Sequence, residues 1–231
     1  MYDREHCKIT VKDGGITAVY DNTVAAENAL RDVIAAEVIV EDIEEVPPYI
    51  FGGKQGVVHI TFGDGVVKIA PAACSACRNL KSVCFSESVV SIGEVAFSRS
   101  GIEVFEAGQG LRIIGRGACF GCPDLKEIVL NKYLVLVGEM AFAFCPKLSS
   151  LVLEIRQSCS VSANAFHGSL NNYGVRAYIA SAFGGTNKKV VSGDTTLHRR
   201  PYVQRKMKLK GKEKERLENI LNLKKTRKPS K

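Results

Sequence analysis

The sequence predicts a solenoid of stacked repeats, preceded by a cap made of a hairpin and a helix and followed by a basic C-terminal tail. The first observation is a pattern that returns every 22 or 23 residues through most of the 231-residue chain. The second is that each copy begins with alternating apolar residues, which is typical of a β-strand with one buried face. The third is an abrupt change of charge after the last copy. These observations together predict an extended repeat body with an appendage of different composition.

Residues 1–33 are predicted to form the N-terminal cap. The segment KITVKDGGITAVY alternates around Asp13-Gly14-Gly15, which predicts a β-hairpin with a glycine-containing turn. Asn22 stands where a helix N-cap is expected, so the sequence predicts a helix from about Thr23 to Glu37. We expect this cap to cover the first repeat.

Residues 34–183 are predicted to form the solenoid. Its copies start at Val57, Leu80, Ile102, Leu125 and Leu148, with a weaker copy from Ile34 and an incomplete last copy around Val175. If the first residue of each copy is position 0, position 3 is always large and apolar, as in Ile60, Val83, Phe105, Ile128 and Leu151. Position 12 is apolar and β-branched in Ile69, Ile92, Ile114 and Val137, and position 16 is alanine in Ala73, Ala96, Ala118 and Ala141. Fixed columns of this kind are what a solenoid requires, because each side chain stacks on its counterpart in the next copy.

Small residues mark the second half of each copy. Position 13 is alanine or glycine, and the pattern Gly-x-x-Ala-Phe predicts a tight turn leading into a short helical turn. We expect the small side chains to let neighbouring backbones approach each other closely.

The columns L-x-x-I-x-L…V-x-x-I-G-x-x-A-F-x-x-C, present here as LKEIVL…LVLVGEMAFAFC, resemble the BspA-type leucine-rich repeat, which is abundant in parasitic protists and some bacteria. The resemblance covers about residues 34–180. It implies a leucine-rich-repeat-like right-handed solenoid with a parallel β-sheet. It also implies a role in protein binding, often in surface adhesion.

The sequence contains two Cys-x-x-Cys pairs, Cys74 with Cys77 and Cys119 with Cys122, a pattern that is typical of zinc sites and redox motifs. Both pairs occupy positions 17 and 20 of their copies, and 41 residues separate them. Since Phe97 and Phe142 share the first of these columns, we interpret the cysteines as core residues and expect no metal site and no cofactor. A disulfide between Cys122 and Cys145, one copy apart, stays open as an alternative.

Nothing in the sequence suggests an activated nucleophile or a catalytic residue, since the four histidines are spread among the cap, a strand, a turn and the tail. No apolar run is long enough to span a membrane, and the first residues are charged, without the apolar core of a signal peptide. We therefore expect a monomeric, intracellular protein, in the cytoplasm or the nucleus, that is not an enzyme.

The exposed strand positions 1, 2 and 4 are the predicted partner-binding face. We assign to it Thr61, Lys81, Ser82, Glu103, Glu106, Lys126, Glu127, Val129, Ser149, Ser150 and Val152. The face mixes charges with outward-pointing valines, among them Val104, which fits a surface that binds a protein. Ordinary surface valines in strands are the competing interpretation.

The tail, residues 184–231, carries the basicity of the chain. Residues 187–231 hold 16 of the 32 Lys and Arg and 4 of the 24 Asp and Glu, a net charge of 16 − 4 = +12, whereas the rest is 16 − 20 = −4. Leu217, Ile220 and Leu221 add a short amphipathic helix pattern to a segment that we expect to be partly disordered. The side chains predicted to contact phosphate groups or a partner are Arg199, Arg200, Arg205, Lys206, Lys208, Lys210, Lys224, Lys225, Arg227 and Lys228. An RNA- or DNA-associated protein is therefore the alternative to a protein-binding scaffold.

Overall fold

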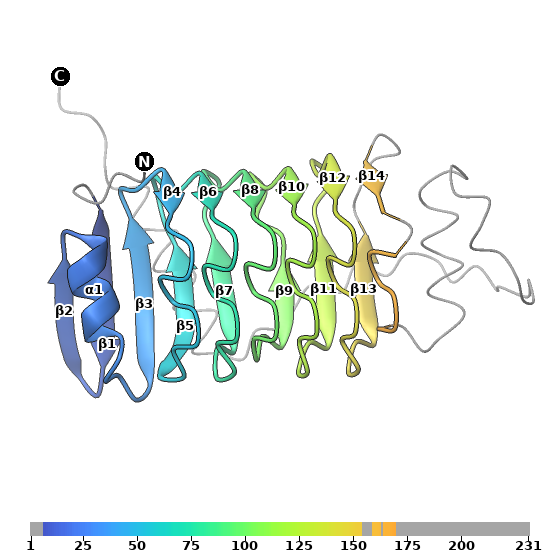
Figure 1. The fold of residues 1–231 in the computed structure, drawn as a ribbon. Coiled ribbons are helices and arrows are strands. Elements are labelled where there is room, and N and C mark those ends of the chain that lie inside the picture. The colour runs from blue at the N-terminus through green and yellow to red at the C-terminus, as the bar shows by residue number, and fades with distance from the viewer. Residues whose placement is uncertain (1–6, 154–158, 163, 170–231) are drawn as a thin grey trace, which may run out of the picture. The chain divides into compact units, whose positions relative to one another are not determined.

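A computed structural model describes residues 7–153, 159–162 and 164–169 of the chain. Within them the chain winds as a solenoid whose copies stack side by side, with one row of long strands and one row of very short strands (Figure 1). The predicted incomplete copy around Val175 and the tail, residues 184–231, lie outside the described residues.

The N-terminal cap contains the predicted hairpin. Strands β1 (Lys8–Asp13) and β2 (Ile16–Tyr20) pair antiparallel, and both glycines of the turn have positive φ, +56° at Gly14 and +88° at Gly15. A residue with a β-carbon rarely adopts these angles, so the glycines fix the turn. Strand β1 also pairs antiparallel with β3 (Ala36–Glu41), so the hairpin extends the row of long strands.

The helix α1 (Thr23–Ala29) begins as predicted, because the Asn22 side chain accepts a hydrogen bond of 2.8 Å from the backbone N–H of Ala25. The prediction that it continues to Glu37 is wrong. From Ala36 the side chains alternate between buried and half-buried as those of a strand do, and this segment pairs with β1 on one side and β5 on the other. Pairing on both sides satisfies the backbone groups and also buries Ala36, Val38 and Val40 in the core.

The long strands form the wide sheet. After β3 they are β5 (Val57–Phe62), β7 (Ser82–Phe85), β9 (Val104–Glu106), β11 (Glu127–Leu130) and β13 (Ser150–Leu153). The predicted position-3 column is confirmed, because Ile60 pairs in register with Val83, and Ile128 with both Phe105 and Leu151.

Strands β7 and β9 lie side by side, but the ladder of hydrogen bonds between them is interrupted. One bond of 3.1 Å, from the N–H of Glu103 to the carbonyl of Lys81, connects the two copies at this point. The interruption falls in the copy that starts at Leu80, which is one residue shorter than its neighbours.

The first copy differs from the repeat template at its start. Ile34 does not occupy a buried first position, since its side chain is 85% exposed, and Ala36 pairs with Val57 in its place. A register shift follows Ala36, and further along the same copy Val46 pairs with Ile69 as the template requires.

A second, narrow sheet was not predicted. Its parallel two-residue strands are β4 (Glu45–Val46), β6 (Lys68–Ile69), β8 (Ser91–Ile92), β10 (Ile113–Ile114), β12 (Leu136–Val137) and β14 (Ser160–Val161). In five of these strands the position-12 residue is buried, and in β14 its counterpart Val161 is half-buried. This column therefore marks a second line of strand pairing along the solenoid.

The Gly-x-x-Ala-Phe segments form consecutive turns, and α1 is the one α-helix among the described residues. The reason is local: in most copies the residues at positions 15 and 19 have positive φ, as in Val95 (+48°) and Arg99 (+56°) or Gly117 (+58°) and Gly121 (+66°). A left-handed residue interrupts a right-handed helix at each of these points. The freed N–H groups bond to the next copy instead, as from Phe97 to the carbonyl of Ala118 at 2.7 Å.

The close backbone approach expected at position 13 is confirmed. A β-carbon built on Gly93, Gly115 or Gly138 would lie within 2.8 Å of backbone atoms of the preceding copy. The core lies between the two sheets and the turns, and six of its rings lie within 6.2 Å of a neighbouring ring: Phe62, Phe85, Phe97, Phe105, Phe142 and Phe166.

Candidate binding face

The eleven residues of the predicted partner-binding face lie together on the outer side of the wide sheet, on or directly before β5, β7, β9, β11 and β13. All are exposed or half-buried, whereas the position-3 residues Ile60, Val83, Phe105 and Ile128 are buried and Leu151 is half-buried. Successive side chains of a strand point to opposite faces, so this alternation creates one continuous outer surface. We call this surface the strand face.

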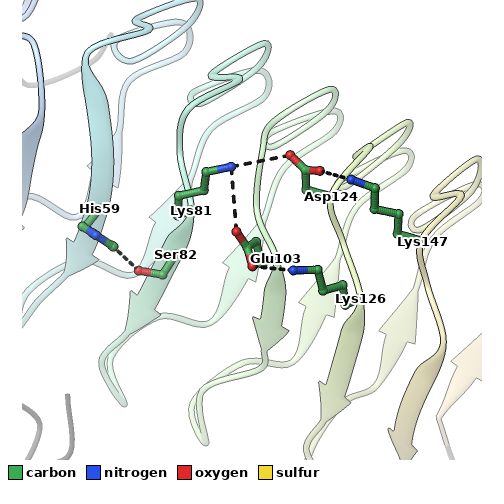
Figure 2. Close-up of polar contacts among 7 residues, drawn as sticks. All are labelled: His59, Lys81, Ser82, Glu103, Asp124, Lys126 and Lys147. Atoms are coloured by element: carbon green, nitrogen blue, oxygen red, sulfur yellow. Dashed lines mark hydrogen bonds and ion pairs between the residues drawn. The ribbon is translucent and has the colours of Figure 1, made fainter. Parts of the chain in front are cut away.

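Charged side chains on the strand face pair from copy to copy (Figure 2). Lys126 donates to Glu103 at 2.8 Å, and Lys147 donates to Asp124 at 2.7 Å. Lys81 lies 3.8 Å from Glu103 and 3.5 Å from Asp124, which joins the two pairs into one network. Asp124 and Lys147 were not part of the predicted face, although their column directly precedes the first residue of the next copy.

This network shifts the ionisation of its members. The hydrogen bond from Lys126 lowers the pKa of the Glu103 carboxyl, and that from Lys147 lowers the pKa of Asp124. A lowered pKa means that the folded state favours the carboxylate, so the stabilisation is present near neutral pH and is lost as the pH falls through the folded-state pKa values. Because these side chains are largely exposed, solvent screening keeps the contribution small.

The valines of the strand face do not form one straight row. Val129 and Val152 are register partners on β11 and β13, and Glu106 on β9 continues their row. Val104 lies in the neighbouring row, opposite Glu127. The apolar part of the face is therefore a half-buried valine pair beside carboxylates, with Val104 at its edge.

Two further residues of the strand face were not in the predicted set. Nδ1 of His59 lies 2.5 Å from Oγ of Ser82, its register partner on β7. Cys84 is exposed on the same strand and pairs with Thr61. The sequence carried the signal for both, because His59 occupies position 2 and Cys84 position 4.

The two Cys-x-x-Cys pairs are buried, and neither their cysteines nor Cys145 form a disulfide bond. The structure explains why cysteine recurs at position 20. The thiols of Cys77, Cys122 and Cys145 each donate a hydrogen bond to a backbone carbonyl of the preceding copy, with Sγ–O distances of 2.7, 3.2 and 3.3 Å. Ser169 takes the same role with its hydroxyl on the carbonyl of Phe142. Position 20 thus favours a small side chain with a hydrogen to donate.

The Cys74 and Cys77 thiols are held in the protonated form. Burial raises the pKa of Cys77 to about 11 and raises that of Cys74 as well. The thiolate is the nucleophile and the metal ligand, so this environment opposes both functions. No group of three or more His, Cys, Asp or Glu is arranged to hold a metal ion in the part of the chain that the structure describes.

The outer side of the narrow sheet exposes apolar residues that sequence reasoning missed. Val90, Ile113, Val135 and Leu136 lie there, at positions 10 and 11 of three successive copies. A signal was present, because four apolar residues in a row precede the small residue at position 13 in LVLVG. Leu134 and Val137 are buried, and the two residues between them face outward.

The model of the BspA type leucine rich repeat region matches residues 44–172 in six copies, which is more than half of the chain. The chain belongs to the BspA-type leucine-rich repeat family. The resemblance seen in the sequence is thereby confirmed, and the two sheets described above are how this member of the BspA-type family stacks its copies.

Two solved structures are similar to this BspA-type chain. A leucine-rich repeat protein from Bacteroides ovatus is 19% identical, and the match covers 59% of this chain and 47% of that one, with a TM-score of 0.43. A leucine-rich repeat protein from T. pallidum is 16% identical, with 64% of this chain and 88% of that one covered and a TM-score of 0.45. The chain thus spans about half of the length of the Bacteroides protein. A search of curated proteins gave no match.

Among the helices of the described residues, none has the length and apolar character needed to cross a membrane.

Proposed function

We propose that this leucine-rich repeat scaffold is a non-enzymatic interaction module that binds a protein partner through its strand face. The observation that carries the proposal is the continuous outer surface of β5 to β13, where the Val129 and Val152 pair lies beside carboxylates and lysines. Apolar area surrounded by polar groups is what protein interfaces present to each other. The wide sheet extends this surface over several copies, so the surface is large enough to contact a protein.

The charge network supports the same function. Lys81, Glu103 and Lys126 hold each other in place by ion pairs before any partner arrives. Side chains that are already ordered lose less conformational entropy when an interface forms. The network therefore presents a fixed pattern of charge around the valines, which favours selectivity for one partner.

Replacing Val129 by lysine tests the strand face. The new side chain would lie between Val152 and Glu106, in an exposed row where a lysine is tolerated, but it would place a charge in the apolar centre of the proposed interface. We expect partner capture from lysate of the source cells to fall about ten-fold or more, as measured by quantitative mass spectrometry. Thermal unfolding should change little.

The matched control is Lys68→Gln, an exposed side chain of the narrow sheet. Proteins that are captured by the natural chain and by the control, and lost with Val129→Lys, are the expected partners. Equal capture by all three chains would rule out the strand face as the binding surface.

A second candidate function rests on the charge of the tail. Residues 187–231 carry a net charge of +12, which favours binding to the phosphate backbone of RNA or DNA. If the tail binds nucleic acid, deleting residues 187–231 should abolish binding to a labelled RNA or DNA duplex, together with its steep decrease as salt rises. Binding that survives the deletion, or that does not weaken with salt, would exclude this candidate.

A further inference from the structure

The narrow sheet carries a second surface with its own chemistry. Val90, Ile113, Val135 and Leu136 are each between 37% and 56% exposed, and Tyr133 lies next to them at 38%. The residues are contiguous across copies: Ile113 and Leu136 are register partners, and Arg112 bonds through its backbone to Val90 on one side and to Val135 on the other. We call this surface the Tyr133 patch: Val90, Arg112, Ile113, Tyr133, Val135 and Leu136.

The Tyr133 patch is also positively charged at one side. The guanidinium carbon of Arg112 lies 5.0 Å from the centre of the Tyr133 ring, and Nζ of Lys132 lies 5.1 Å from it. Nη1 of Arg112 donates to the backbone carbonyls of Gln109 and Leu111, at 2.8 and 3.2 Å. These contacts hold the guanidinium in one orientation on the ring.

The two cations differ from those of the strand face in what they pair with. On the strand face each lysine of the network lies within 4 Å of a carboxylate of a neighbouring copy. Within the described residues, no carboxylate lies within ion-pair distance of Arg112 or Lys132. The guanidinium of Arg112 is held in one orientation and still has N–H groups that can donate hydrogen bonds. It is therefore well suited to bind a carboxylate of another molecule.

We propose that the Tyr133 patch is a second binding surface, and that its ligand is an acidic, apolar segment of a partner protein. An Asp or Glu of that segment pairs with Arg112, with Lys132 adding long-range attraction. Its apolar side chains cover Ile113, Val135 and Leu136. Contiguous exposed apolar residues beside polar ones are typical of interaction sites, and the unpaired positive charge selects an acidic ligand over a basic one.

Panning a random-peptide display library against the full chain tests the proposal. We expect the enriched peptides to carry Asp or Glu next to apolar residues. Synthetic copies of them, measured by fluorescence anisotropy, should bind about ten-fold more weakly to Arg112→Gln, and the loss should be only partly restored in Arg112→Lys, which keeps the charge but not the planar fork. Lys132→Gln and Leu136→Ser should each weaken binding by a smaller factor.

If Arg112→Gln fails to fold, Lys132→Gln still tests the positive charge of the patch. This variant is expected to fold normally, because the Lys132 side chain makes no hydrogen bond within the described part of the chain. Lys12→Gln, an exposed side chain of β1 in the cap, is the matched control and should leave peptide affinity unchanged. The proposal is overturned if no peptide is enriched, if enriched peptides lack acidic residues, or if their binding is insensitive to both Arg112→Gln and Lys132→Gln.

Two other occupants are distinguished by parallel measurements. Self-association in sedimentation velocity that disappears in Leu136→Ser would assign the patch to a second copy of the chain. Binding to phosphatidylserine vesicles that requires Arg112 and displaces the peptides would assign it to a lipid surface. Either result would overturn the peptide proposal. Neither would affect the proposed binding through the strand face, because that function is tested separately by Val129→Lys.

Discussion

Replacing Gly115 by valine is expected to lower the free energy of unfolding by about 3 kcal/mol. A β-carbon at this position would lie 2.8 Å from the carbonyl carbon of Gly93 and 2.8 Å from the carbonyl oxygen of Ile92. That oxygen accepts the hydrogen bond from Gly115 itself, so the two copies cannot separate without breaking the narrow sheet. Urea unfolding followed by circular dichroism measures the loss.

Gly121→Ala is the matched control for this substitution. Gly121 has φ +66°, but a β-carbon there would meet a single atom, Cγ of Arg99 at 3.7 Å. We expect Gly121→Ala to lower the free energy of unfolding by about 1 kcal/mol, because alanine disfavours a positive φ. If Gly115→Val lowers the free energy of unfolding no more than Gly121→Ala does, the close approach of the two copies is contradicted.

Replacing Phe105 by alanine is expected to lower the free energy of unfolding by about 3–5 kcal/mol. The ring is fully buried, and its centre lies 5.7 Å from that of Phe85 and 5.2 Å from that of Phe142. It packs where the hydrogen-bond ladder between β7 and β9 is interrupted, so side-chain packing carries much of the connection between these two strands. The cavity left by alanine removes that packing.

Phe120→Ala removes the same atoms from a half-buried ring, which lies 5.4 Å from Phe144. We expect a cost of about 1 kcal/mol from this change, measured in the same denaturant series. If both variants lose equal stability, the interruption between β7 and β9 is not bridged by the aromatic core.

The wide sheet was predictable because its strands are long enough to show alternation. Ile60, Val83, Phe105 and Ile128 repeat at a fixed interval, and the stacking of such columns dictates which residues become neighbours. The alternating signs of Lys81, Glu103 and Lys126 in one column also carried the information for the charge network, once the copies are placed side by side.

The narrow sheet and the turns were less accessible to sequence reasoning. A strand of two residues shows no alternation, so Ile92 and Ile114 indicated a buried column but not its pairing. The N–H groups of Val95 and Arg99 donate to carbonyls of the next copy, and these hydrogen bonds, not residue type, account for the positive φ, since neither residue favours it. The Tyr133 patch depends on the pairing of the narrow sheet, so the sequence showed its apolar residues but not that they lie side by side.

The stacking of the copies in register is the claim on which both proposed surfaces depend, and the exposed thiol of Cys84 offers a direct measurement of it. Thr61 is the register partner of Cys84 on the adjacent strand, whereas Ile39 lies one strand further away. Adjacent strands place such residues within the distance a disulfide bridges. After mild oxidation, peptide mass spectrometry should find the cross-link to Cys84 in Thr61→Cys and not in Ile39→Cys. A cross-link to Cys84 in Ile39→Cys, or its absence in Thr61→Cys, would contradict the register.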